Sequence, residues 1–84
     1  MRVVFKSQAL DDLAYLEKRH RRLAERVYLL LESIERAPFE GLGKPEPLKY
    51  RLSGKWSRRI DYIHRLVYDV SGETVTVYSC RFHY

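Results

Sequence analysis

The chain has 84 residues, of which 45% are hydrophobic and 32% are charged, with a formal net charge of +5. This length and composition predict one globular domain over residues 1–84 and exclude a second core or a disordered chain. The sequence has no apolar run that could cross a membrane, no signal-peptide pattern and a single cysteine, so we expect a cytoplasmic protein without membrane contact or an internal disulfide.

The first half of the chain predicts one strand followed by two helices. The β-branched run at residues 2–5 favours a strand, and Ser7 is placed to cap the helix after it. The second helix ends before Pro38, because the residue before a proline avoids helical angles. Its apolar residues recur at helical spacing, and they are Leu23, Val27, Leu30 and Ile34.

After Pro38 the pattern changes from helical spacing to loops and alternation. Glycine and proline predict a loop over residues 39–47, and alternating apolar and basic residues predict a strand over 48–52. Further strands are expected at 55–63, 64–70 and 74–84, the last two forming a hairpin. The predicted fold class is therefore α+β, with two N-terminal helices packed on one face of a small, mainly antiparallel twisted sheet.

Positive charge and aromatic rings are concentrated in the second half of the chain. Residues 47–84 hold seven Lys/Arg and three Asp/Glu, whereas residues 1–46 hold nine and eight. Cations interleaved with aromatic side chains suit a phosphate backbone with unstacked bases. A basic surface that serves only solubility remains the alternative.

One carboxylate stands out within this basic region. Glu46 lies between Pro45 and Pro47, which would hold it rigidly, as a catalytic base requires. Arg65 can bind a phosphate through two parallel hydrogen bonds, and His83 titrates near neutral pH. A general base, a phosphate-binding arginine and a general acid are what intramolecular attack by an RNA 2′-hydroxyl needs. No spacing typical of metal ligands occurs, so we expect no metal and no cofactor.

Longer motifs carry a resemblance to a known family. The runs PFEGLGKPEPLK, LSGKWSRRI, HRLVY and the terminal CRFHY, which cover most of residues 38–84, resemble the YoeB toxins of the RelE/ParE superfamily. The resemblance implies a RelE-like, microbial-ribonuclease-like fold and a ribosome-dependent mRNA endonuclease that cuts in the ribosomal A site. It also implies a YefM-like antitoxin as partner, with operator DNA bound only through the toxin–antitoxin complex. Homodimer formation stays open.

The resemblance also implies roles for individual residues. Glu46 corresponds to the general base, Arg65 stabilises the transition state, His83 is the general acid and Tyr84 positions the substrate. The cations expected to contact RNA are Lys49, Arg59 and Arg81. This chain departs from many relatives at Ile63, where they have a carboxylate beside the active-site strand.

Other interpretations remain open from the sequence. A ParE-like toxin that inhibits DNA gyrase without cutting RNA is the main alternative function, and a non-cleaving RNA-binding module is a weaker one. Arg65 could instead pair with Asp61 or Asp69 across the sheet, and His64 is expected to be structural. Packing is the default expectation for the remaining aromatic and thiol side chains, Tyr50, Trp56, Tyr68 and Cys80.

Alternation along the last predicted strand also assigns its final residues to faces of the sheet. It places His83 on the side of Val77 and Arg81, and Tyr84 on the side of Tyr78 and Cys80.

Overall fold

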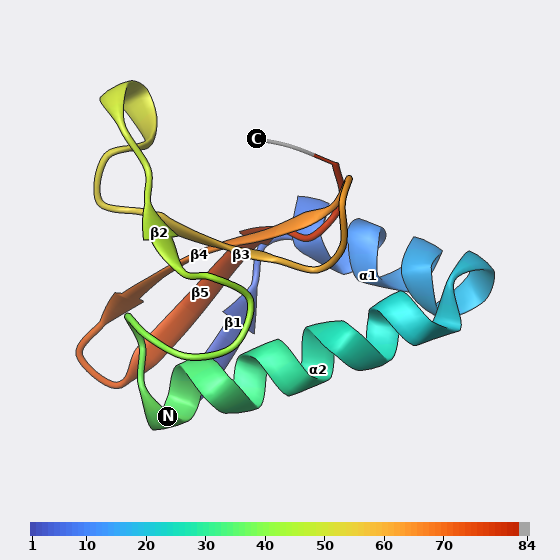
Figure 1. The fold of residues 1–84 in the computed structure, drawn as a ribbon, viewed down its shortest axis with the longest axis horizontal. Helices are drawn as coiled ribbons and strands as arrows, with labels where there is room; N and C mark the ends of the chain where they lie inside the picture. Colours follow the sequence, from blue (N-terminus) through green and yellow to red (C-terminus); the bar gives the residue numbers. More distant parts are fainter. Residues whose placement is uncertain (83–84) are drawn as a thin grey trace.

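The computed structural model describes residues 1–82 and shows two helices with a five-stranded sheet (Figure 1). This arrangement confirms the predicted α+β class. In chain order the elements are β1 (Arg2–Phe5), α1 (Ser7–Arg19), α2 (Arg21–Arg36), β2 (Glu46–Pro47), the short 3₁₀ helix η1 (Tyr50–Leu52), β3 (Trp56–Arg59), β4 (Arg65–Ser71) and β5 (Thr74–Ser79).

The sheet has the strand order β1-β5-β4-β3-β2. Its three pairs among β2, β3, β4 and β5 are antiparallel, and β1 joins β5 in parallel. A parallel pair needs a long crossover between neighbouring strands, and the segment containing α1 and α2 begins that connection. The topology leaves β2, which carries Glu46, as one edge of the sheet.

The hydrophobic core lies between the two helices and one face of the sheet. The apolar stripe of α2 is buried as its spacing predicts, with Val27, Leu30 and Ile34 fully inaccessible. These side chains belong to one cluster with Val75 and Val77 of β5. Because strand side chains alternate between faces, the other face of the sheet is left for polar residues. In Figure 1 the segment carrying η1 projects from the sheet on the side away from α2.

Residues 48–52 do not form the predicted strand. Leu52 N–H donates to the Lys49 carbonyl and Ser53 N–H to the Tyr50 carbonyl, which closes a 3₁₀ turn. Leu48 N–H bonds the Lys55 carbonyl, so the chain must reverse within this short segment. Residues 48–52 alternate in polarity, but they form a loop in which only Leu48 is buried, and not a pleated strand.

Two further expectations at the ends of elements were wrong. Helix α1 begins at Ser7 itself, with Lys6 as its N-cap, and no side chain caps it. Strand β5 ends at Ser79, and its pairing with β4 shifts register between Val67 and Tyr68. Val77 and Cys80 are both buried, so strict alternation fails before the chain end, and His83 and Tyr84 lie outside the described residues.

Cys80 packs in the core, as expected. It has no accessible surface, its Sγ lies 3.7 Å from the Ala9 carbonyl, and its N–H donates to Asp12 Oδ2 at 3.0 Å. Burial, followed by the nearby Asp12 charge, raises the pKa of the Cys80 thiol to about 12.

We expect this thiol to be inert in the folded protein, because only the thiolate reacts. At pH 8 a disulfide reagent such as Ellman's should modify the native chain at least about 100-fold more slowly than the chain unfolded in urea. Equal rates in the two states would contradict the buried environment of Cys80.

Neither helix is long and apolar enough to span a membrane, within the part of the chain that the structure describes.

Candidate active site

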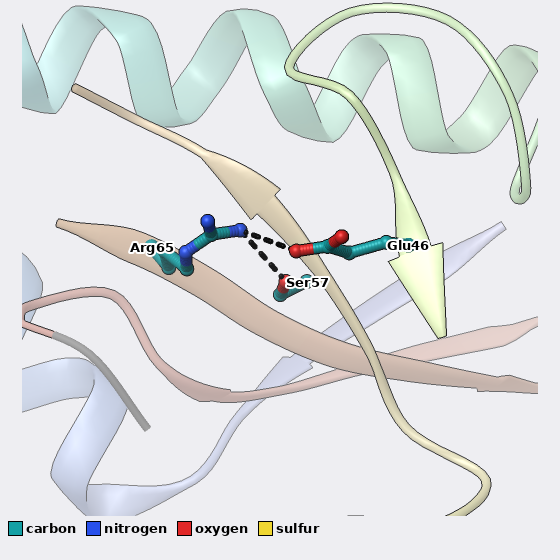
Figure 2. A network of polar contacts seen from close by, with 3 residues as sticks. All are labelled: Glu46, Ser57 and Arg65. Atoms are coloured by element: carbon teal, nitrogen blue, oxygen red, sulfur yellow. Dashed lines mark hydrogen bonds and ion pairs between the residues drawn. The ribbon is translucent and has the colours of Figure 1, made fainter. Parts of the chain in front are cut away.

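Glu46 and Arg65 meet on the face of the sheet that the helices leave uncovered. Glu46 lies in edge strand β2 opposite Ser57 of β3, and Arg65 begins β4 opposite Arg59. An Arg65 guanidinium nitrogen, Nη1, donates to Glu46 Oε1 at 2.9 Å and to Ser57 Oγ at 3.3 Å (Figure 2). The base and the phosphate-binding arginine of the sequence analysis are therefore direct neighbours, although 19 positions separate them.

The exposure of the two side chains differs in a way that suits those roles. The Glu46 side chain is 52% exposed, whereas that of Arg65 is 14% exposed. A proton acceptor must be reachable by a substrate hydroxyl, while a cation that stabilises charge acts more strongly when partly shielded from water. Within residues 1–82 the structure pairs Arg65 with Glu46, which differs from the alternative of pairing with Asp61 or Asp69.

The prolines on either side of Glu46 fit the edge position of β2. Pro47 lacks an N–H, which an edge strand tolerates because it does not need every donor for a ladder. A residue before proline prefers extended backbone, and this holds Glu46 in the strand conformation that pairs with Ser57.

A buried arginine organises the loop that leads from α2 to Glu46. Arg58 has no accessible surface, and its guanidinium uses all five of its donors. The acceptors are the hydroxyls of Tyr68 and Ser33 and the backbone carbonyls of Ala37, Glu40 and Leu42, at 2.8–3.1 Å. Residues 37–42 are thus wrapped around one side chain of β3.

Further contacts hold the same loop. The Tyr68 hydroxyl donates to the Pro38 carbonyl at 2.7 Å, and burial raises the Tyr68 pKa although the Arg58 charge opposes this. Gly43 has a φ of +86°, and a Cβ there would lie 2.7 Å from Leu30 Cδ2. Its carbonyl accepts the N–H of Arg59 at 2.7 Å, which joins the loop to β3 just before Glu46.

Two of the cations predicted to bind RNA lie near the Glu46–Arg65 pair along the chain or across the sheet. Arg59 is exposed and lies opposite Arg65 in the register of β3 and β4. Lys49 is exposed and follows Glu46 by three residues. A hollow of about 430 Å³ is lined by residues 46–52. Its volume is within the range of roughly 300–1,000 Å³ that small-molecule sites occupy.

Arg81, the third predicted cation, has a different environment. Its guanidinium carbon lies 3.4 Å from the ring centroid of Tyr15 in α1 and 4.5 Å from that of Phe82. Arg81 Nε is buried and makes no hydrogen bond within the described residues. The structure therefore places the Arg81 guanidinium against two aromatic rings.

Phe82, the last described residue, contacts both His64 and Arg65 through its backbone. Phe82 N–H donates to His64 Nδ1 at 2.8 Å, and its carbonyl accepts the Arg65 N–H at 3.1 Å. His83 and Tyr84, the predicted acid and positioning residue, follow immediately in sequence but lie outside the described residues.

The packing role predicted for three aromatic side chains holds for two of them. Trp56 packs its ring on Phe39, with centroids 4.7 Å apart, and Tyr68 is fully buried, so both expectations are confirmed. Tyr50 is 91% exposed, so its packing role was wrong. The turn at η1 gives Tyr50 a φ of +58° and directs its side chain away from the core.

Two residues of this region were not singled out from the sequence. Ser57 is buried and bonds Arg65, and Arg58 supports the loop. The alternation of side chains along the strand could have indicated that Arg58 is buried, because it places Arg58 on the same face as the apolar Trp56 and Ile60. Within residues 1–82, no group of three His, Cys, Asp or Glu side chains is placed to hold a metal ion.

The fold is that of the small α+β toxins of the RelE type, and comparison with known proteins identifies the family. Residues 5–84 match the model of the YoeB-like toxin of bacterial type II toxin-antitoxin systems. Toxin YoeB of Synechocystis sp. is 45% identical over all of this chain and 98% of its own length. Toxin YoeB of Escherichia coli K12 is 43% identical, with both chains fully covered.

Solved structures agree with this assignment. A YoeB/ParE toxin from Agrobacterium tumefaciens superposes with a TM-score of 0.97 at 44% identity, with both chains fully covered. A YoeB dimer and a YoeB-YefM complex from Staphylococcus aureus superpose with TM-scores of 0.94 and 0.92 at 40% identity, over all of this chain and 98% of theirs. The chain therefore belongs to the family of YoeB-like toxins of bacterial type II toxin–antitoxin systems.

Proposed function

We propose that this toxin is a ribosome-dependent mRNA endonuclease that cuts in the ribosomal A site and so inhibits translation. The observation that carries the proposal is the 2.9 Å contact between Glu46 and Arg65 on the uncovered sheet face, next to exposed cations. A carboxylate and a guanidinium at this separation can both reach one phosphodiester and the hydroxyl beside it.

In the proposed reaction Glu46 accepts the proton of the ribose 2′-hydroxyl, and the 2′-oxygen attacks the neighbouring phosphorus. Arg65 exchanges its contact with Glu46 for the phosphate oxygens, where negative charge develops in the transition state. Ser57 holds Arg65 at 3.3 Å, which limits how far the guanidinium can move. Lys49, Arg59 and Arg81 add positive potential for the RNA backbone.

The bond between phosphorus and the 5′-oxygen then breaks. His83 donates a proton to this leaving oxygen, and Tyr84 helps to position the substrate. The products are a 2′,3′-cyclic phosphate, or the 3′-phosphate formed when it opens, and a 5′-hydroxyl. Each proton has a donor and an acceptor in this scheme, so the reaction requires no metal or other cofactor.

The proposed partners follow from the relatives and from the charge of the chain. A YefM-like antitoxin binds and neutralises the toxin; a YoeB-YefM complex from Staphylococcus aureus is the structural precedent for this pairing. Operator DNA is bound only through the complex of this toxin with its antitoxin. Homodimer formation has a precedent in the same relative. The toxin acts in the cytoplasm, where ribosomes and message are found.

The chemistry of the RNA ends tests the mechanism. We expect message incubated with ribosomes and toxin to be cut in the A site, and primer extension will map the cut. The downstream fragment should accept phosphate from polynucleotide kinase without prior phosphatase treatment, because it carries a 5′-hydroxyl. A 5′-phosphate would exclude the 2′-hydroxyl as nucleophile and point to water or hydroxide instead.

The same assay separates this proposal from its alternative. Cleavage that depends on ribosomes supports the endonuclease. Intact message together with inhibition of DNA gyrase supercoiling would instead support a ParE-like binding toxin.

A further inference from the structure

His64 is the one described side chain that binds the backbone just before His83. Its Nδ1 accepts the Phe82 N–H at 2.8 Å, and the two rings lie 5.4 Å apart between centroids. On its other side, Phe82 offers its carbonyl to the Arg65 N–H at 3.1 Å. Both polar groups of Phe82 are therefore bound by the adjacent residues His64 and Arg65.

The backbone that carries this imidazole is held in a turn. The backbone N–H of His64 donates to Asp61 Oδ1 at 2.7 Å, and the same oxygen accepts the Ile63 N–H. The His64 carbonyl accepts the N–H groups of Ile60 and Asp61. The ring is buried, with His64 8% exposed, and its Nδ1 is bound to the Phe82 N–H. Because Nδ1 accepts a backbone N–H, the neutral ring carries its proton on Nε2.

The backbone that His64 binds is in a conformation that needs support. Phe82 has a φ of +61°, in the left-handed region that is unfavourable for a non-glycine residue. Hydrogen bonds to both of its polar groups offset this cost and select the turn. Without the Nδ1 acceptor, Phe82 N–H would be a part-buried donor with no partner, and the extended conformation would be favoured.

We propose that His64 is a positioning residue whose Nδ1 sets the turn at Phe82 beside Arg65, and that this turn supports proton donation to the leaving oxygen by the next residue in sequence, the proposed general acid His83. This inference rests on the proposed function. It assigns to His64 a role beyond packing, because it acts on one proton transfer and leaves the Glu46–Arg65 pair intact. Loss of position on the order of 1 Å is enough to lower a rate by about 100-fold.

The first test compares His64→Asn with His64→Gln. An asparagine Oδ1 lies near the position of Nδ1, whereas a glutamine amide extends toward that of Nε2, so only asparagine keeps the acceptor for Phe82. The measured quantity is the single-turnover rate constant for cleavage of ribosome-bound message. We expect the rate constant of His64→Asn to be within about threefold of that of the unsubstituted toxin, and that of His64→Gln to be about 10–100-fold lower. Ribosome affinity should be the same for all three proteins. Equal rate constants for the two variants would overturn the proposal.

The second readout isolates the proton transfer. A message with sulfur in place of the bridging 5′-oxygen at the cut releases a thiolate, which needs no proton because a thiol has a pKa of about 8.5. We expect the sulfur substrate to restore His64→Gln and His83→Ala to near the unsubstituted rate, while Glu46→Gln stays slow. A His64→Gln defect that persists with sulfur would mean that His64 acts on something other than the acid, and would overturn the inference.

A backbone variant covers the case in which His64→Gln does not fold. Cys80 allows a synthetic peptide of residues 80–84 to be ligated to a thioester ending at Ser79. Replacing the Phe82 amide with an ester removes only the N–H that His64 binds. The ester protein should show the same sulfur-rescued loss relative to an all-amide protein made by ligation. If the all-amide protein leaves ribosome-bound message uncut, the proposed function fails; if it cuts and the ester protein cuts equally well, only the role of His64 fails.

Discussion

Replacing Glu46 with glutamine is expected to slow cleavage of ribosome-bound message by about 10²–10⁴-fold, because it removes the proposed proton acceptor, a carboxylate that pairs with Arg65, while keeping the shape of the side chain. Glutamine can still accept a hydrogen bond from Arg65, so the β2–β3 edge should stay in place. An exposed ion pair contributes only about 0–1 kcal/mol, and the melting temperature should therefore change little.

Glu40→Gln is the matched control for this experiment. Glu40 is an exposed carboxylate in the same loop, and Arg58 binds its backbone carbonyl, not its side chain. The two variants share the change in net charge and differ only in which carboxylate is lost. Cleavage by Glu46→Gln at the rate of Glu40→Gln would show that another group removes the 2′-hydroxyl proton.

Replacing Arg58 with methionine is expected to be the most destabilising change outside the hydrophobic core. Removal of the guanidinium takes the Arg58 donor from two hydroxyls and three carbonyls, and each of these that water does not reach costs about 1–3 kcal/mol. Partial relaxation of the loop lowers the sum, so we expect a loss of about 3–5 kcal/mol in the free energy of unfolding. Urea unfolding monitored by circular dichroism measures this directly.

Arg59→Met provides the comparison at the next position. Arg59 is exposed, and the same substitution there should change the free energy of unfolding by no more than about 0.5 kcal/mol. A loss below about 1 kcal/mol for Arg58→Met would mean that the carbonyls of residues 37–42 find other donors. The loop would then not depend on this arginine to present Glu46.

Local pattern was sufficient for the helices and for the identity of the central pair. The stripe of α2 requires a buried face whatever it packs against, and Pro38 limits the helix by backbone sterics alone. Glu46 and Arg65 could be named because the motifs around them are long, and the structure brings them to 2.9 Å. The roles assigned to them, and to His83 and Tyr84, stay predictions.

The ends of elements could not be predicted as well, because they depend on which other segment each residue pairs with. Residues 48–52 alternate like a strand, yet the pairing of Leu48 with Lys55 forces a turn there. The end of β5 is set by the register shift against β4 and by Asp12 of α1, which accepts the Cys80 N–H. Asp12 lies 68 positions before Cys80, so no local window of sequence contains both residues.

The sequence by itself determined the fold class, the family and the two charged residues of the site, since these follow from periodicity, backbone sterics and motifs read along the chain. Only the tertiary structure decided what each basic side chain does. Arg58 is a buried anchor, Arg59 an exposed cation, Arg65 the partner of Glu46 and Arg81 a stacked guanidinium. One residue type takes four roles, because burial and available acceptors depend on the strand face and on the elements packed against it.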